Sequence, residues 1–158
     1  MTESDSIDTS SRLQKVLIVE DNKQTRELMR KFFDKACNRG DLKCMIIEAS
    51  NGESAIKMLE SEEPDLILCD IGLPDIDGFG VLKYYKEDYK LRHPFCFFTF
   101  LTASASERKK AFEESALSFL AKTEINYYTL TLQVKTWLRL SFLERSLEIQ
   151  QANEDLDL

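Results

Sequence analysis

Five short apolar runs recur along this 158-residue chain, and segments with helical spacing of apolar residues separate them. Short apolar runs are typical of strands buried on both faces, whereas the longer periodic segments between them favour helices. Regular strand–helix alternation predicts an α/β fold, with a parallel sheet covered on both faces and right-handed crossovers. The predicted strands are Lys15–Val19, Cys44–Ile47, Leu66–Cys69, Phe95–Leu101 and Leu117–Ala121.

The helices are predicted between these strands from the spacing of their apolar residues. Ser104, with Glu107 three residues later, forms a capping-box pattern that predicts the start of one helix. The last helix is predicted to begin near Asn126 and to run almost to the end of the chain. The other predicted helices cover 23 to about 38, the segment that holds Ala55, Ile56, Met58 and Leu59, and about 79 to 89.

Length and composition favour one folded domain with short extensions. The chain is 43% hydrophobic, which is enough for a core, and its net charge of -7 argues against a general nucleic-acid or anionic-membrane surface. No apolar run approaches the roughly 20 residues that a membrane-spanning helix needs. Residues 1–13 are polar and lack an apolar signal core, so we expect a disordered N-terminal arm there.

Four cysteines are present without CxxC spacing, and His93 is the only histidine. These two facts argue against a zinc site, because structural zinc needs clustered sulfur and imidazole ligands. We therefore interpret the cysteines as reduced thiols of a cytoplasmic protein.

Polar residues follow four of the five apolar runs, at the point where each predicted strand ends. The carboxyl ends of parallel strands meet at one edge of a sheet, where open α/β sheets bind their ligands. We therefore expect these side chains to converge on one crevice. They are Glu20 and Asp21 after the first strand, Asp70 after the third, Thr102 (followed by the apolar Ala103) after the fourth, and Lys122 after the fifth.

This set of side chains suits phosphoryl transfer. Carboxylates packed together raise one another's pKa values, and a divalent cation with oxygen ligands, such as Mg²⁺, relieves that repulsion. Lys122 adds a positive charge and Thr102 a hydroxyl donor, which together can hold phosphoryl oxygens. Asp70 would then be the nucleophile that forms an acyl phosphate.

Each of these residues also has a simpler explanation when it is taken alone. Glu20 and Asp21 could cap the helix that follows them, and Asp70 could be a cap or turn residue. Thr102 could be a turn hydroxyl and Lys122 a solvated loop lysine. The coincidence of such groups at four matching strand ends favours the site over these separate explanations.

Five stretches of the chain carry a family resemblance. The Asp70–Gly78 stretch is the most specific, and all five occur in the order that the family shows. Over residues 14–143 the chain resembles the CheY-like receiver domain of two-component response regulators. The five stretches are Val16–Asn22, Glu48–Ala55, Asp70–Gly78, Leu101–Ala103 and Phe119–Lys122.

The resemblance implies a doubly wound sheet with the strand order 2-1-3-4-5, and phosphoryl transfer to Asp70. The donor would be a sensor histidine kinase or a histidine phosphotransfer protein. Mg²⁺ would be the cofactor, and catalysis would be limited to self-catalysed phosphoryl transfer and autodephosphorylation, so that the protein is not an enzyme. The resemblance implies Mg²⁺ binding by Asp21, Asp70 and the Gly72 carbonyl, with Glu20 acting largely through water, and phosphoryl contacts from Thr102, Lys122 and the Ala103 N–H.

The resemblance also implies a switch. Thr102 and Lys122 would move toward the phosphoryl group, and Phe119 would turn into the space that Thr102 leaves. The surface formed by the helix after Ser104, the fifth strand and the last helix would then change for output or dimerisation. We expect Phe119 to serve also as a core aromatic of its strand.

The chain departs from the family pattern at three places. Thr123 follows Lys122 where the family usually has proline, so we predict a trans peptide bond between them, because a cis bond before other residues costs about 3–4 kcal/mol. The loop from Asn38 to Leu42 is longer than we expect. Phenylalanines crowd the segment from Phe95 onward, either as alternating core residues or as a partner-binding patch.

Helical periodicity continues past residue 143, and we interpret 144–158 as a helical extension or a linker to an absent output domain. One apolar track is interrupted by Arg145, and the other holds Leu140, Leu143 and Leu147 before Gln150. Neither is an unbroken coiled-coil pattern. The extension is therefore either a solvated helix end or a helix that pairs two subunits.

Three rival functions are less consistent with the residues. A phosphatase of the haloacid dehalogenase class would need a second aspartate where Gly72 stands. A flavodoxin-like flavin binder would need a phosphate-cradling loop where the acidic Glu20 and Asp21 stand. A receiver that no longer accepts phosphate would lack part of the five-residue site, which is complete here. The kinase, the signal and the output are not identified by the sequence.

Overall fold

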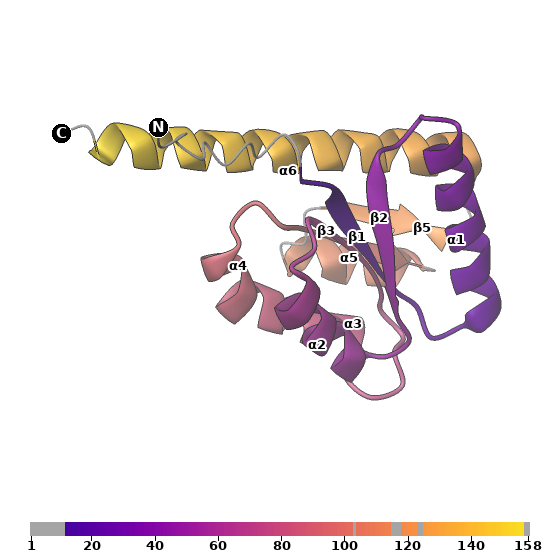
Figure 1. Cartoon of the computed structure of the whole chain (residues 1–158). Coiled ribbons are helices and arrows are strands. Elements are labelled where there is room, and N and C mark those ends of the chain that lie inside the picture. Colours follow the sequence, from indigo (N-terminus) through magenta and orange to yellow (C-terminus); the bar gives the residue numbers. More distant parts are fainter. Residues whose placement is uncertain (1–11, 103, 115–117, 123–124, 157–158) are drawn as a thin grey trace.

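The structure is a computed structural model that describes residues 12–102, 104–114, 118–122 and 125–156, apart from the side chains of Thr102, Ala105 and Ser118. Its centre is a parallel sheet with the strand order β2-β1-β3-β4-β5, as the resemblance implied (Figure 1). The strands are β1 (Gln14–Val19), β2 (Cys44–Ala49), β3 (Leu66–Asp70), β4 (Phe97–Thr102) and β5 (Ser118–Ala121).

Helices cover both faces of the sheet, which confirms the predicted fold class. In Figure 1, α1 and α6 lie against one face, and α2 and α3 lie on the opposite side. The longest, α6, projects well past the sheet. The helical elements are α1 (Lys23–Asn38), α2 (Gly52–Glu62), α3 (Gly78–Tyr84), the π-helical turn η2 (Tyr85–Tyr89), α4 (Lys90–Arg92), α5 (Ala105–Glu113) and α6 (Tyr127–Leu156).

Two apolar layers hold the helices to the sheet, one on each face. One layer joins strand residues such as Leu17 and Ile67 to α2, α3 and α5. The other joins strand residues such as Ile18 and Leu68 to α1 and α6. Alternate residues of one strand therefore pack into opposite layers, as the two-residue period of a strand requires. All five residues of β3 are buried, so Asp70 ends the strand that is most completely enclosed.

Strand β4 begins two residues later than the sequence predicted. The N–H of Cys96 donates to the carbonyl of His93 at 3.1 Å, so a turn takes up the segment that we had placed at the start of the strand. The helix before it is correspondingly longer than predicted and continues through η2 to Arg92. Tyr85 and Tyr89 are both buried on this helix, and the Tyr85 hydroxyl donates to the Cys96 carbonyl.

The phenylalanines of the β4 region are explained by packing. Phe98 and Phe100 are buried in the layer beneath α2 and α3. Phe97 is half-buried and packs on the opposite layer. Phe95 lies before the strand, where the guanidinium of Arg145 sits 3.9 Å from the centre of its ring. The core explanation for this segment therefore holds for the strand residues, and α6 covers Phe95.

Helix α6 remains attached to the domain beyond Leu143. The Arg145 guanidinium lies 2.7 Å from Oδ1 of Asp65, a residue that is only 1% exposed. Asp65 also accepts a hydrogen bond from the backbone N–H of Lys15 at 2.8 Å. Arg145 therefore compensates a buried charge at the edge of the sheet that lies opposite the strand ends. The boundary predicted at residue 143 stays a prediction.

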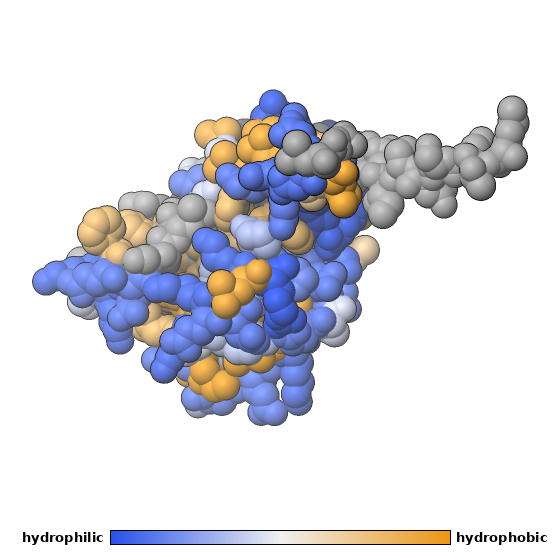
Figure 2. Space-filling view, turned by 90° about the vertical axis from the view of Figure 1, so that its left-hand side faces the viewer, coloured by the Kyte–Doolittle hydropathy of each residue, from blue (hydrophilic) through white to orange (hydrophobic). Residues whose placement is uncertain are grey.

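No helix among the described residues has both the length and the apolar character to cross a membrane. Figure 2 shows a mainly hydrophilic face on which the hydrophobic residues form separate patches.

Replacing Arg145 tests the α6 anchor. Arg145→Met keeps an aliphatic chain against Phe95 but leaves the Asp65 carboxylate without its cation. We expect the free energy of unfolding to fall by about 2–4 kcal/mol, because a buried carboxylate loses its partner. Arg139→Met is the matched control, since Arg139 is exposed on α6 and has no ion pair within the described part of the chain. Its change should stay within about 0.5 kcal/mol.

The measurement is urea unfolding of both variants and of the double variant Asp65→Asn with Arg145→Met. The double variant should recover part of the lost stability, because it removes the unpaired charge. If Arg145→Met and Arg139→Met lower the free energy of unfolding equally, the ion pair between Arg145 and Asp65 does not stabilise the fold.

Candidate functional site

Three charged side chains from different strand ends meet at the carboxyl edge of the sheet. Glu20 follows β1, Asp70 ends β3, and Lys122 follows β5. The Lys122 ammonium lies 3.0 Å from Oδ1 of Asp70 and 3.1 Å from Oε2 of Glu20. Strands β1 and β3 are neighbours in the sheet, and β4 separates β3 from β5. The three side chains nevertheless meet at one edge of the sheet, as the sequence predicted.

Asp21 completes an acidic cluster with two of these residues. Carboxylate oxygens of Glu20, Asp21 and Asp70 all lie within 4.8 Å of one another. Glu20 is fully buried and Asp70 nearly so, whereas Asp21 is exposed. The cluster therefore has a buried floor and one side open to solvent, which gives a small ion or a phosphoryl group access to Asp70.

The carboxyl and ammonium groups shift one another's protonation. Burial, and then the Asp70 carboxylate, raise the pKa of Glu20 above its ordinary value, although Lys122 and the N–H of Asn22 oppose this. Burial alone would lower the pKa of Lys122, but its contacts with Asp70 and Glu20 outweigh burial and raise it. Lys122 therefore stays charged at neutral pH and compensates the buried acids.

The cluster fits a hard divalent cation. Oxygen ligands at this spacing, one of them open to solvent, are the donors that Mg²⁺ uses in proteins. Oε2 of Glu20 is buried beside Lys122 but has no aligned hydrogen-bond donor among the described residues. A buried carboxylate oxygen with unused acceptor capacity is consistent with a cation or its water ligand at this place.

The acids of this cluster are not helix caps, because Asn22 caps α1. Its side-chain oxygen accepts the N–H of Thr25 at 2.9 Å. Glu20 instead accepts the N–H of Asn22 through Oε1 at 3.1 Å, and its own carbonyl accepts from Arg26 at 2.8 Å. The capping explanation for Glu20 and Asp21 is therefore wrong, and both carboxylates face the site region rather than the helix end.

Gly78 holds the loop that follows Asp70 against the strand. Its N–H donates to the Ile71 carbonyl at 2.8 Å. A Cβ atom at this position would lie 2.4 Å from the Asp70 carbonyl oxygen and 2.7 Å from the Cα of Ile71, so only glycine fits without a shift. Asp77, directly before it, caps α3 by accepting the N–H of Gly80 at 2.9 Å.

Asp75 also supports this loop, and the sequence interpretation gave it no role. Its carboxylate accepts the backbone N–H groups of Gly52 and Glu53, both at 2.8 Å. These bonds, first that from Glu53, lower the pKa of Asp75. They fasten the loop after Asp70 to the first turn of α2. The only signal in the sequence is an acid in a turn-rich stretch, which does not identify its partner.

The remaining predicted site residues are described only in part. Gly72 is exposed, and the position of a Cβ there would be open space. The backbone of Thr102 pairs with Ala121 at the end of β4, but its side chain lies outside the described residues, as does Ala103. The Lys122–Thr123 peptide bond also falls outside them, so its trans geometry stays a prediction.

Phe119 corrects one expectation. It is 39% exposed, so it is not a core aromatic of β5 in this structure. Leu120, the next residue, is buried instead. The reason is that successive side chains alternate between faces, and β5 is an edge strand with fewer neighbours to cover it.

Known proteins resemble this chain over most of the fold. A family model described as "Response regulator receiver domain" matches residues 16–132. The polar-differentiation response regulator DivK of Brucella anthropi is 37% identical over 78 residues, which cover 49% of this chain and 58% of that protein. A protein-glutamate methylesterase/protein-glutamine glutaminase 1 of Syntrophomonas wolfei is 31% identical over 109 residues, covering 68% of this chain and 29% of that protein. The chain thus spans less than two thirds of these curated relatives.

Solved structures show the same architecture. The signal receiver domain of a Luxo repressor protein from Vibrio parahaemolyticus matches with a TM-score of 0.73 and 27% identity, covering 87% of this chain and 98% of that one. A CheY-like response regulator receiver domain protein from Methanospirillum hungatei has a TM-score of 0.68 and 21% identity, covering 84% and 99%. The second likeness supports the fold alone.

The raised pKa of Glu20 predicts a pH-dependent effect of its replacement. Above pH 4.5 the unfolded chain has lost the Glu20 proton, whereas the folded protein keeps it up to its higher pKa. The contribution of Glu20 to stability therefore falls as pH rises through that window. Glu20→Gln, which cannot ionise, should gain stability relative to the unchanged protein as pH rises above 4.5.

The measurement is urea unfolding in EDTA at several pH values, with Glu27→Gln as the control. Glu27 is an exposed carboxylate on α1, 3.8 Å from Lys23. A difference between Glu20→Gln and the unchanged protein that stays constant with pH, or falls, would contradict the prediction.

Proposed function

The chain belongs to the response regulator receiver domain family of two-component signalling, and we propose that it is a phosphorylation-controlled switch whose phosphoacceptor is Asp70. The observation that carries this proposal is the placement of the Asp70 carboxylate. It ends the buried central strand β3, with the Lys122 ammonium 3.0 Å from Oδ1 and two further carboxylates close by.

The chemistry is an exchange of one phosphorus bond for another. A carboxylate oxygen of Asp70 bonds to the phosphorus of a phosphohistidine donor, and the bond from phosphorus to the imidazole nitrogen breaks. The imidazole leaves with that electron pair. Lys122 already lies within ion-pair distance of Asp70, so it can neutralise charge on the phosphoryl oxygens without a large movement.

We propose Mg²⁺ as the cofactor, held by Asp21 and Asp70 with the Gly72 carbonyl, and with Glu20 acting largely through water. The family membership and the 4.8 Å cluster of carboxylate oxygens support this assignment. When bound, the ion supplies positive charge that offsets the negative oxygens of acceptor and phosphoryl group. Glu20 and Asp21 position that charge, and the buried floor limits how many waters reach Asp70.

We propose no catalysis beyond transfer to Asp70 and hydrolysis of the resulting acyl phosphate. In hydrolysis a water oxygen bonds to phosphorus, the bond to the Asp70 oxygen breaks, and inorganic phosphate leaves. The open space beside Gly72 supports water access on that side. Thr102 and the N–H of Ala103 remain the proposed phosphoryl contacts from the end of β4.

The proposed output surface consists of α5, β5 and α6. Phe119 is on this surface and is 39% exposed, which suits the outward position of an aromatic switch. Phosphorylation would add about two negative charges and three acceptor oxygens at Asp70. Thr102 and Lys122 would move toward them, and Phe119 would turn inward into the space released.

The proposed phosphoryl donor is a sensor histidine kinase or a histidine phosphotransfer protein, and we place the protein in the cytoplasm. We also propose a homodimer through α6. Its exposed apolar residues Leu140, Leu143 and Leu147 recur at the spacing of a two-helix contact.

Acetyl phosphate tests the phosphoacceptor. Incubation with acetyl phosphate and Mg²⁺ should add the mass of one phosphoryl group, and Asp70→Asn should remove this adduct because the amide is not a nucleophile for phosphorus. Intact mass spectrometry, followed by borohydride trapping and peptide mapping, locates the adduct. Asp34→Asn is the matched control, because Asp34 is an exposed acid on α1 that pairs with Arg30 and lies outside the acidic cluster.

Lys122→Met should slow phosphorylation about tenfold or more, because the developing charge loses its ammonium partner. EDTA should suppress the adduct in the unchanged protein. An adduct that persists in Asp70→Asn, or that needs no divalent cation, would contradict the assignment.

Sedimentation tests the dimer. Leu143→Glu together with Leu147→Glu should raise the dimer dissociation constant by about tenfold or more, since each factor of ten corresponds to only about 1.4 kcal/mol. Leu91→Glu is the control, because Leu91 is also an exposed leucine, 79% exposed, but lies on α4. The comparison is made with and without phosphorylation. A strict monomer in both states of the unchanged protein would eliminate this part of the proposal.

A further inference from the structure

Two cysteine sulfurs lie in contact away from the acidic cluster. Cys37 is in the last turn of α1, and Cys44 is the first residue of β2. Their Sγ atoms are 3.9 Å apart, and the Cys37 sulfur also lies 3.6 Å from the Cys44 carbonyl oxygen. This distance is a van der Waals contact between two thiols, so only a small displacement separates them from a covalent bond.

The loop between these cysteines holds them in place through the backbone. The N–H groups of Asp41 and Leu42 both donate to the Ala36 carbonyl, at 2.8 and 3.2 Å. Gly40 adopts a φ of +79°, which reverses the chain with no side chain to strain it. Because a disulfide needs sulfurs about 2.0 Å apart, the Cys37 and Cys44 sulfurs must approach by roughly 1.9 Å. Rotation of the two side chains would have to supply this movement.

Reagents can reach this pair but not the other thiols. Cys37 and Cys44 are both partly exposed, whereas Cys69 and Cys96 are fully buried in the core beneath the sheet. Buried structural thiols are inert, and exchange requires an accessible sulfur. The chain therefore contains its own internal comparison between an accessible pair and two enclosed thiols.

We propose that Cys37 and Cys44 are a modification site that forms a reversible intramolecular disulfide by exchange with a small disulfide such as glutathione disulfide. The Cys37 thiolate attacks one sulfur of the small disulfide, forming a mixed disulfide and releasing one thiolate. The Cys44 thiolate then attacks the Cys37 sulfur and releases the second. The two protein thiols lose two electrons and two protons, and the small disulfide gains them as two thiols.

The order of attack follows from the surroundings of Cys44. Burial, and then the neighbouring Cys37, raise the pKa of Cys44 to about 12, so Cys44 supplies little thiolate at neutral pH. Once Cys37 has formed a mixed disulfide, its thiol no longer raises the pKa of Cys44. Cys37 therefore reacts first, and Cys44 resolves the mixed disulfide because the two sulfurs are already adjacent.

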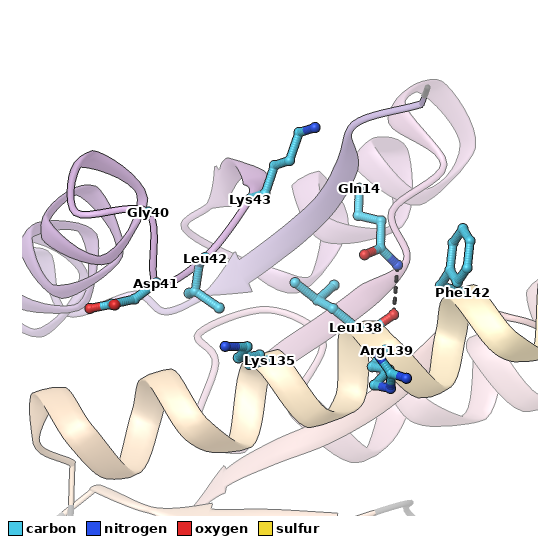
Figure 3. A pocket seen from close by; sticks show the side chains of 9 residues that line it. All are labelled: Gln14, Gly40, Asp41, Leu42, Lys43, Lys135, Leu138, Arg139 and Phe142. Atoms are coloured by element: carbon cyan, nitrogen blue, oxygen red, sulfur yellow. Dashed lines mark hydrogen bonds between the residues drawn. The ribbon is translucent and has the colours of Figure 1, made fainter. Parts of the chain in front are cut away.

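The loop that this bond would close also contacts α6. The Tyr127 hydroxyl, in the first turn of α6, donates to Oδ2 of Asp41 at 2.5 Å, and the Lys35 ammonium lies 4.5 Å from the centre of the Tyr127 ring. Figure 3 shows the Gly40–Lys43 segment opposite α6. Residues of this segment and of α6 line a pocket of about 320 Å³. The disulfide would thus fix the loop that borders the beginning of the proposed dimerisation helix.

The test is equilibration of the full chain in glutathione buffers of graded redox potential. Samples are quenched with acid, alkylated, and analysed by intact mass and by non-reducing peptide mapping. We expect one species that is lighter by two hydrogen atoms, that resists alkylation at two cysteines, and that maps to a Cys37–Cys44 peptide pair. Dithiothreitol should reverse it completely.

Variants make the outcome specific. Cys37→Ser should leave the chain without a disulfide. Cys44→Ser should accumulate glutathione on Cys37, because the resolving thiol is missing. Cys96→Ala is the matched control and should form the disulfide as before, with circular dichroism confirming that each variant is folded. Four alkylated cysteines in fully oxidised buffer would overturn the proposal. So would stable glutathione adducts on the unchanged protein, a bond to Cys69 or Cys96, or a bond between chains.

Discussion

The ammonium group of Lys122 is the interaction on which the carboxyl edge of the sheet depends. It is within 3.1 Å of two carboxylates, of which Glu20 is fully buried and Asp70 nearly so. Two enclosed acids without a cation would be unfavourable, because burial penalises each charge and each charge penalises the other. The compensating cation comes from the end of β5, an edge strand, and the acids from β1 and β3. The charges therefore balance only when the whole sheet has formed, which joins the stability of the fold to the geometry of the site.

The general plan of the sheet and the convergence of the strand ends were predictable, because a parallel sheet leaves few alternatives once the apolar runs are located. Which polar group binds which backbone atom was not predictable. Asn22 caps α1 in place of its acidic neighbours, and Asp75 reaches the first turn of α2. The Asn22 contact depends on the conformation of the loop just before α1, and the Asp75 contacts join segments 22 and 23 residues apart in the sequence. Phe119 was misjudged for a related reason, since exposure at an edge strand depends on what covers it.

Arg145 shows a second limit of periodicity. In the sequence it interrupts an apolar track and weakens the case for a coiled coil. In the structure the same residue pairs with Asp65, eighty residues earlier, and stacks on Phe95. The interruption of the track is therefore the attachment point of α6. A helical pattern reports which residues share a face, but it does not report that a charged residue on that face has a buried partner. The apolar residues Leu140, Leu143 and Leu147 remain exposed because the domain holds the helix by a different face.

Strand β3 links these two charged contacts. Asp65 precedes the strand and holds Arg145 of α6, while Asp70 ends it and holds Lys122. The five residues of β3 are all buried and pair with β1 on one side and β4 on the other, so the strand is a rigid span of roughly 17 Å. A phosphoryl group on Asp70 would therefore act beside a fixed strand and not move it. In the proposed switch the parts that would respond are Thr102, Lys122 and Phe119 of β5, while α6 would stay anchored through Arg145. Any change at the output surface would then be a movement of β5 and the start of α6 relative to that anchor.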